Sequence, residues 1–120
     1  MTGQEESGID SEWFENLPCG ITVCDRNYEI LYMNGKSAEV HEESGGKDLI
    51  GTNLLDCHPA EAQKKLREVM KSGRPNVYTI EKKGVKKMIY QCHWRLGRRV
   101  GGLVELTFVL PKQVPHHVRK

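Results

Sequence analysis

The 120-residue sequence has no apolar run that approaches the ~20 residues a helix needs to span a membrane. Its first residues, MTGQEESGIDSEW, are polar and acidic and lack the apolar segment of a secretory signal. We therefore expect a cytoplasmic protein with no membrane partner.

The four cysteines show none of the spacings typical of metal or redox sites. Cys19, Cys24, Cys57 and Cys92 form no CxxC or CxxCH motif, which argues against a zinc ribbon, a thioredoxin-like pair and covalently attached haem c. Without a secretory signal, free thiols are expected instead of disulfides. The sequence predicts no metal site.

Excess charge and catalytic motifs are also scarce. The formal net charge is only +2 and the basic residues are dispersed, which argues against a nucleic-acid partner. The segment 45–47, GGK, lacks the remainder of a phosphate-binding P-loop, and no GxSxG or HExxH motif occurs. We therefore expect no enzymatic activity.

The residues that are present indicate one folded domain, with 38% hydrophobic and 28% charged residues. The clearest element is an amphipathic helix. Pro59 suits its first helical position, with His58 as the N-cap, and Gly73 ends it. Its apolar stripe needs a partner to cover it, and the flanking segments have the composition of strands. The stripe consists of Ala62, Leu66, Val69 and Met70.

Five segments predict strands: residues 19–25, 28–33, 76–82, 85–96 and 103–110. Short helices are expected at 10–17 and 34–42, with a helical turn around 48–50. Residues 1–9 and the tail 111–120 are expected to be flexible. The order predicts an α+β domain at 10–110 with one antiparallel sheet.

The strand at 85–96 alternates between apolar and polar residues. Its even positions are mostly apolar, so we expect them to form the covered face, with the polar odd positions on the wetter face. The glycine-rich segment 97–102 is expected to form a hairpin loop before the last strand.

In this order the segments resemble a PAS domain over about residues 12–110. The resemblance is carried by LPCGITVCDRNYEILYMN at 17–34, LIGTNLLD at 49–56 and the CHP sequence at 57–59. The last is similar to a variant of some bacterial and archaeal PAS modules. The resemblance implies a five-stranded sheet in the order 2-1-5-4-3, with helices on one face around a small cavity.

The resemblance also implies a sensory or interaction module. Such a module binds a small ligand or cofactor, or senses redox state, and relays the signal to a partner or to an output domain of a parent chain. Many PAS domains form homodimers through the outer sheet face and the helix before the first strand, which implies an interface at Trp13, Phe14 and Leu17. The alternatives are a small thiol-based redox protein or enzyme that uses Cys57 and His58, and a dimerisation scaffold without a ligand.

Cys57 and His58 are the main candidates for ligand or cofactor binding, since thiolate and imidazole are common donors. Alternatively, His58 caps the helix and Cys57 packs in the core. Similarity to haem-binding PAS domains would place the proximal histidine at position 62, which is Ala62 here, so haem could bind only through His58 in another geometry. Residues 53–58 do not match the flavin photoadduct motif, and the cofactor stays unknown.

A second set of residues could line the cavity or fill the core, and periodicity does not separate these functions. The set consists of Met33, Met88, Tyr90, Cys92 and Trp94. Cys92 and His93 are neighbours on a predicted strand, so they point to opposite faces and cannot bind one ion without distortion.

Overall fold

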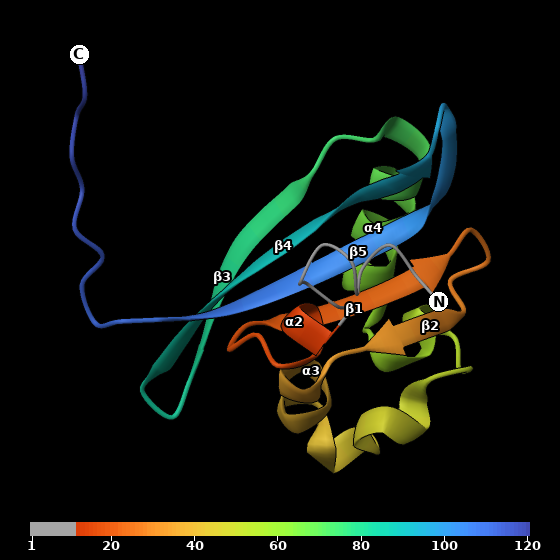
Figure 1. Ribbon diagram of the computed structural model, residues 1–120, viewed down its shortest axis with the longest axis horizontal. Helices are drawn as coiled ribbons and strands as arrows, with labels where there is room; N and C mark the ends of the chain where they lie inside the picture. Colours follow the sequence, from red (N-terminus) through yellow and green to blue (C-terminus); the bar gives the residue numbers. More distant parts are fainter. Residues whose placement is uncertain (1–11) are drawn as a thin grey trace.

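The computed structural model describes residues 12–120 and shows one five-stranded antiparallel sheet in the order β2-β1-β5-β4-β3 (Figure 1). This confirms the predicted fold class and strand order. The strands are β1 (Gly20–Asp25), β2 (Ile30–Met33), β3 (Asn76–Lys82), β4 (Val85–Leu96) and β5 (Arg99–Leu110). The helices are α2 (Glu12–Glu15), α3 (Gly35–Val40) and α4 (Ala60–Ser72), with short 3-10 helices η1 (Glu42–Ser44), η2 (Gly46–Leu49) and η3 (Leu54–Cys57).

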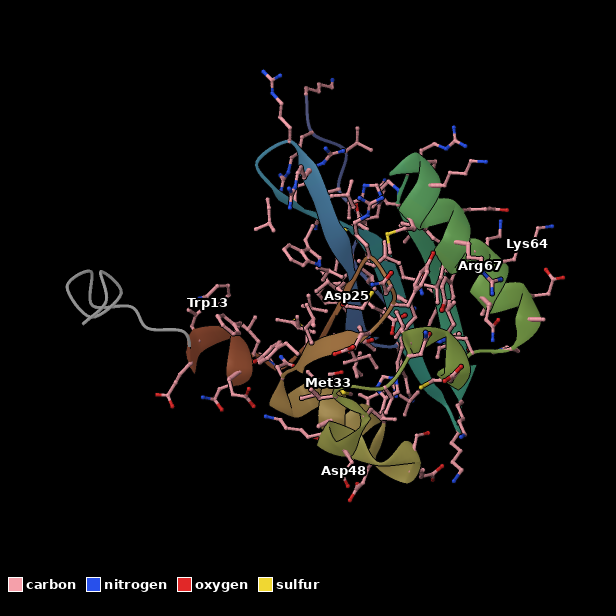
Figure 2. All side chains as sticks on the ribbon, turned by 90° about the vertical axis from the view of Figure 1, so that its right-hand side faces the viewer. Trp13, Asp25, Met33, Asp48, Lys64 and Arg67 are labelled. Atoms are coloured by element: carbon pink, nitrogen blue, oxygen red, sulfur yellow. The ribbon has the colours of Figure 1, made fainter. Side chains whose placement is uncertain are left out.

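The helices divide the sheet into two faces. α3 packs on β1, and α4 contacts β3, β4 and β5. We call the face that they cover the inner face and the opposite one the outer face. Figure 2 shows α2, with Trp13, on one side of the sheet and α4, with Lys64 and Arg67, on the other. The helices that follow β2 therefore lie on one face, as predicted, and α2 lies beside the outer face.

The core lies between the inner face and α4. Leu66, which is 1% exposed, and Val69 insert from α4. Burying an aliphatic side chain of this size stabilises the fold by about 1.5–3 kcal/mol, so the apolar stripe of α4 holds the helix on the sheet. The buried apolar residues that pack in this cluster are Cys24, Ile30, Met33, Leu54, Leu66, Val69 and Leu103.

Asn34 fixes the junction between α2, β1 and α3. Its Oδ1 accepts hydrogen bonds from the backbone N–H groups of Ser37 and Ile21, each at 2.9 Å. Its Nδ2 donates to the carbonyl oxygens of Phe14 and Cys19. This side chain is fully buried, and all of these bonds are satisfied inside the protein. Asn34 thus caps α3 and also anchors α2.

The ends of α4 differ in part from the prediction. Pro59 has extended backbone angles (φ −68°, ψ 164°) and is the N-cap, so Ala60 is the first helical residue. The predicted N-cap at His58 is therefore wrong by one position. His58 instead ends η3. Gly73 ends α4 in the left-handed conformation (φ 77°), and its N–H donates to Val69 O at 2.8 Å, as expected for a C-terminal glycine.

The predicted loop at 97–102 is wrong, because both strands continue through it. Leu96 pairs with Arg99, so only Gly97 and Arg98 form the turn. The two further glycines serve close packing inside β5. A side chain at Gly102 would overlap the backbone of β1, and one at Gly101 would overlap the indole of Trp94.

The predicted orientation of β4 is also wrong. Ile89 and Gln91 are buried on the inner face, and His93 Nε2 donates to the Met70 carbonyl of α4 at 2.8 Å. The odd positions of β4 therefore face the helices. The even positions Met88, Tyr90, Cys92 and Trp94 lie on the outer face and are half-buried.

Of the two terminal segments expected to be flexible, the structure describes only the C-terminal one. Residues 1–9, and the first two residues of the helix expected at 10–17, lie outside the described residues. Residues 111–120 form no helix or strand, are exposed and lead away from the sheet (Figure 1). Their flexibility stays a prediction. Within residues 12–120, no helix is both long and apolar enough to cross a membrane.

Candidate functional site

A chain of polar side chains crosses the inner face under α4. Gln91 on β4 lies opposite Glu105 on β5, and its Nε2 donates to Glu105 Oε2 at 2.7 Å. Asn76 on β3 donates from Nδ2 to Gln91 Oε1 at 2.9 Å. At the other end, His58 Nε2 lies 3.8 Å from Glu105 Oε2, which is an ion-pair distance. We call these four residues the polar chain.

Glu105 is a buried charge. Only 6% of the residue is exposed. Burial alone would raise its pKa, but the interactions with His58 and Gln91 outweigh burial, and the pKa of Glu105 lies below its ordinary value. In turn, the Glu105 carboxylate raises the pKa of His58 against the opposing effect of burial. At pH values between the lowered pKa of Glu105 and the raised pKa of His58, the two side chains therefore form an ion pair.

The orientation of His58 is fixed by η3. Its Nδ1 lies 2.8 Å from the carbonyl oxygen of Leu54, which can only accept, so Nδ1 donates. The side chain of Gln63 donates to the carbonyl oxygens of His58 and Leu55 and ties η3 to α4. Both imidazole nitrogens are thus engaged. His58 does not cap α4 with its side chain, since that helix has no side-chain cap.

The space beside His58 is small. A cavity of about 10 Å³ lies between the inner face, η3 and the segment after α3, which is room for about one water molecule. Cys57, His58 and Met33, all predicted ligand contacts, come together here. The full lining is Thr22, Ile30, Met33, His41, Leu49, Leu54, Cys57, His58 and Glu105. Haem does not fit, because both nitrogens of His58 are engaged and the cavity is too small.

A larger cavity of about 310 Å³ opens at the other end of the polar chain. Asn76, Tyr78 and Gln91 line it from the sheet. Glu61, Ala62 and Lys65 line it from the first half of α4. It therefore combines amide hydrogen-bonding groups with the ring of Tyr78 and apolar helix surface, at a volume typical of small-molecule sites.

The outer face of the sheet is apolar. Its centre is Leu106, which pairs with Ile21 on β1 and Tyr90 on β4. The structure places four predicted ligand contacts here, Met88, Tyr90, Cys92 and Trp94, and so does not bring them together with His58. The apolar residues of this face on the three central strands are Ile21, Val23, Met88, Tyr90, Cys92, Trp94, Val104, Leu106, Phe108 and Leu110.

α2 extends this apolar surface beyond β2. The Phe14 ring contacts Tyr32 edge-on with centroids 5.4 Å apart, and Trp13 is 58% exposed. Glu15 holds the helix in place by accepting from the Tyr32 hydroxyl at 2.7 Å and from Lys47 Nζ at 2.8 Å. Leu17, the third residue of the predicted interface, is half-buried.

The next features are the possible metal ligands and the cysteine thiols of the described residues. Within residues 12–120, no three His, Cys, Asp or Glu side chains are grouped so that they could hold a metal ion. Cys92 and His93 point to opposite faces, as expected. Cys57 is exposed, and partial burial of its thiol, followed by the charges of Asp56 and Glu105, raises its pKa.

Gln91, Glu105 and Asn76 were not among the site residues predicted from the sequence. A signal was present for Glu105, because it is the one charged residue in the apolar strand sequence LVELTFVL. A glutamate between apolar neighbours in a central strand must either face water or have a buried partner. Gln91, which donates to Glu105, and Asn76, which donates to Gln91, had no comparable signal in the sequence.

A comparison with models of protein families found a match to the PAS fold over residues 14–98. A comparison with curated proteins found no match.

Solved structures provide fold neighbours at low sequence identity. The chain is similar to Vibrio cholera VqmA in a complex with ligand and DNA (21% identity, TM-score 0.67), covering 92% of this chain and 52% of that one. It is also similar to the PAS domain of the histidine kinase ThkA (17% identity, TM-score 0.62; 75% and 97% covered). A third neighbour is the Aer2 receptor of Vibrio cholerae, described as a dual PAS-heme oxygen sensor (14%, 0.59; 78% and 95%). The chain thus spans about half of the VqmA chain.

Proposed function

The chain belongs to the PAS fold family, and we propose that it is a sensory module in which a small polar molecule binds under α4 against the polar chain. The structural change caused by binding is transmitted through the sheet to a second copy of the module and to an output domain or signalling partner. VqmA combines a chain of similar fold with ligand and DNA, which supports an output function outside this domain.

The buried Glu105 is the observation that supports ligand binding most directly. A carboxylate in a domain core costs stability unless hydrogen bonds and an opposite charge compensate it. Here Glu105 has one partner on each side, Gln91 and His58, and Gln91 also lines the 310 Å³ cavity. A ligand that bonds to Gln91 would therefore change the hydrogen bonding of Glu105.

The cavity suggests the chemistry of the ligand. Gln91 and Asn76 offer amide donors and acceptors, and Tyr78 and Ala62 offer apolar contact. Glu61 and Lys65 at the rim carry opposite charges, so the site favours no net ligand charge. We infer a neutral or zwitterionic small molecule. Cys57, His58 and Met33 line the 10 Å³ cavity at the other end of the polar chain, and we propose that they respond to the ligand through Glu105.

The outer face supports a homodimer as the second part of this function. The apolar side chains of the three central strands, continued by Phe14 and Trp13 on α2, form a surface that water solvates poorly. A second copy offers an identical surface, and two such faces can cover each other around a two-fold axis. This gives Met88, Tyr90, Cys92 and Trp94 a function at the interface.

Native mass spectrometry and an absorption spectrum of the purified protein test the ligand proposal. We expect a co-purifying small molecule, or a metabolite from a neutral-ligand library that raises the melting temperature. Ligand that binds only the folded state stabilises it by mass action, by about 2.7 kcal/mol at a hundredfold excess over Kd. Tyr78→Ala, at a partly exposed cavity position, should abolish the effect without unfolding the protein.

The matched control is Val77→Ala, the neighbouring position on β3, which lies on the outer face. It should leave ligand binding unchanged. If no molecule co-purifies and no library compound raises the melting temperature, the ligand proposal is contradicted and the dimerisation scaffold becomes the better description.

A further inference from the structure

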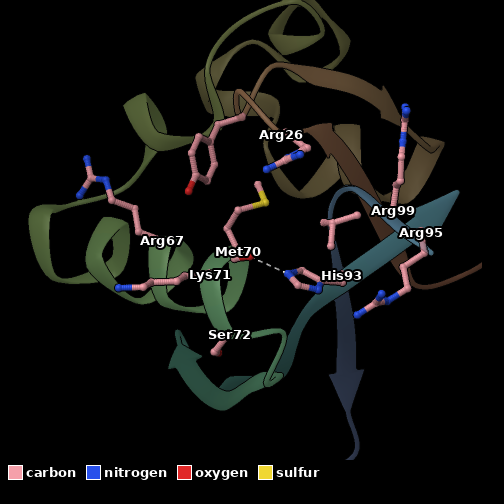
Figure 3. A pocket seen from close by; sticks show the side chains of 10 residues that line it. Arg26, Arg67, Met70, Lys71, Ser72, His93, Arg95 and Arg99 are labelled. Atoms are coloured by element: carbon pink, nitrogen blue, oxygen red, sulfur yellow. Dashed lines mark hydrogen bonds between the residues drawn. The ribbon is translucent and has the colours of Figure 1, made fainter.

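A second and larger pocket, of about 610 Å³, lies on the other side of α4 from the proposed ligand site (Figure 3). Three separate elements form it: the β1–β2 turn, the last turns of α4, and the ends of β4 and β5 next to their hairpin. Its lining residues are Arg26, Tyr28, Arg67, Met70, Lys71, Ser72, His93, Arg95, Arg99 and Val100.

Five of these ten residues are cationic and none is acidic. They are Arg26, Arg67, Lys71, Arg95 and Arg99. The whole chain carries a net charge of only +2, so this concentration does not follow from overall basicity. The ion pairs of the described part of the chain involve none of the five. Arg67 and Arg95 have only neutral hydrogen-bond partners, Gln63 Oε1 and Arg98 O, each at 3.3 Å.

The backbone brings these cations together although they come from distant parts of the sequence. Asp25 next to Arg26 is occupied by the β1–β2 turn, because its Oδ1 accepts from the N–H groups of Asn27 and Glu29. The left-handed Gly97 closes the hairpin that carries Arg95 and Arg99. Neighbouring cations repel each other, so the free protein holds this arrangement at a cost that an anion would relieve.

The wall of the pocket is apolar and aromatic. Figure 3 shows Met70 and His93 at its centre, joined by the hydrogen bond from His93 Nε2 to Met70 O. Tyr28 and Val100 complete this wall. The carboxyl end of α4 points here, and its dipole opposes an anion. The two cations of α4 itself, Arg67 and Lys71, offset that effect.

We propose that this pocket binds a phosphorylated small molecule, with the phosphate held by the arginines and an apolar or aromatic part against Tyr28 and Met70. The planar guanidinium matches phosphate oxygens in paired hydrogen bonds, and a phosphate dianion compensates more of the five charges than one carboxylate does. The concave shape and the volume match a small molecule better than the extended backbone of a nucleic acid. This site is separate from the one proposed for sensing.

Calorimetric titration at low salt with adenosine monophosphate, adenosine and inorganic phosphate tests the proposal, because low salt leaves exposed charges unscreened. We expect adenosine monophosphate to bind more tightly than either of the other two. Arg26→Gln combined with Arg67→Gln should weaken its binding about tenfold or more, since two charged hydrogen-bond donors are lost. Both arginines are exposed, so circular dichroism should show an unchanged fold.

The control combines Arg74→Gln with Arg119→Gln, which removes the same charge from exposed arginines outside the pocket. It should bind adenosine monophosphate like the unmodified protein. Equal weakening by both pairs would show a non-specific charge effect and overturn the proposal. Equal binding of adenosine and adenosine monophosphate, or binding of a short DNA duplex or anionic vesicles in place of the nucleotide, would overturn it as well.

Discussion

The Glu105 carboxylate and the His58 imidazole lie 3.8 Å apart between the sheet and η3, where His58 connects the helical layer to the central strand. Replacing either residue would leave the other as a buried charge without its partner, which is costly in free energy.

This pair predicts a specific pH dependence of stability. The pKa of His58 is raised from its ordinary 6.5, so its contribution is complete below that pH and is lost as the pH rises through the folded-state pKa. The pKa of Glu105 is lowered from 4.5, so its contribution is lost as the pH falls below that value. Urea unfolding should therefore give maximal stability between pH 4.5 and 6.5.

His58→Gln should lower the unfolding free energy at pH 6 by about 3 kcal/mol, because the carboxylate is left buried without its cation. It should also flatten the loss of stability from pH 6.5 to 8.5. His117→Gln in the exposed tail is the control and should change neither quantity. An unchanged slope in His58→Gln would contradict the ion pair.

Gly73→Ala should destabilise the protein more than Gly84→Ala. Both glycines have nearly the same left-handed angle, φ 77° and 78°, so the backbone strain of about 1–2 kcal/mol is common to both. Only at Gly73 would the new Cβ lie 3.1 Å from the His93 ring, whereas nothing lies within 4 Å at Gly84. Thermal unfolding should show the larger loss at Gly73, and equal losses would mean that His93 moves freely.

Leu106→Lys should convert the proposed homodimer into monomers. The substitution places a charge at the centre of the outer face, where it would be desolvated at the interface. Val109→Lys, on the same strand but on the other face and 49% exposed, should leave the dimer intact. Light scattering after size exclusion measures both, and a Leu106→Lys dimer would exclude the outer face as the interface.

Cys57 should react slowly with a disulfide reagent. Its pKa is raised, mainly by burial, so little thiolate forms at pH 7. We expect a rate no higher than that of a cysteine in an unstructured peptide, and no decrease in His58→Ala. A fast reaction that depends on His58 would instead support the alternative of a thiol-based redox protein.

The sequence predicted the elements better than it predicted which side of the sheet they face. β3 and β4 begin and end at the predicted residues, and alternation of apolar and polar residues was the signal for β4. The same alternation led to the wrong covered face of β4, because apolar residues were assigned to the helix-covered side. In this fold the outer face is also apolar, and Gln91 faces inward because its amide has hydrogen-bond partners on β3 and β5.

Local signals also failed where the cause lies far away in the sequence. Gly101 and Gly102 indicate a loop when considered with their neighbours alone. They are strand residues because Trp94 packs on one and the backbone of β1 on the other. The basic pocket escaped detection for the same reason, since its arginines stand up to 73 positions apart, from Arg26 to Arg99, and only the fold brings them together.

The alternation of side chains along β5 has a mechanical consequence. Glu105 points to the inner face and Leu106 to the outer face, and their Cα atoms are joined by one peptide at a fixed ~3.8 Å. A displacement of the carboxylate along the strand therefore moves the leucine with it. Because β5 runs on into residues 111–120, a shift of this strand would move the buried carboxylate, the outer-face leucine and the residues after the strand together.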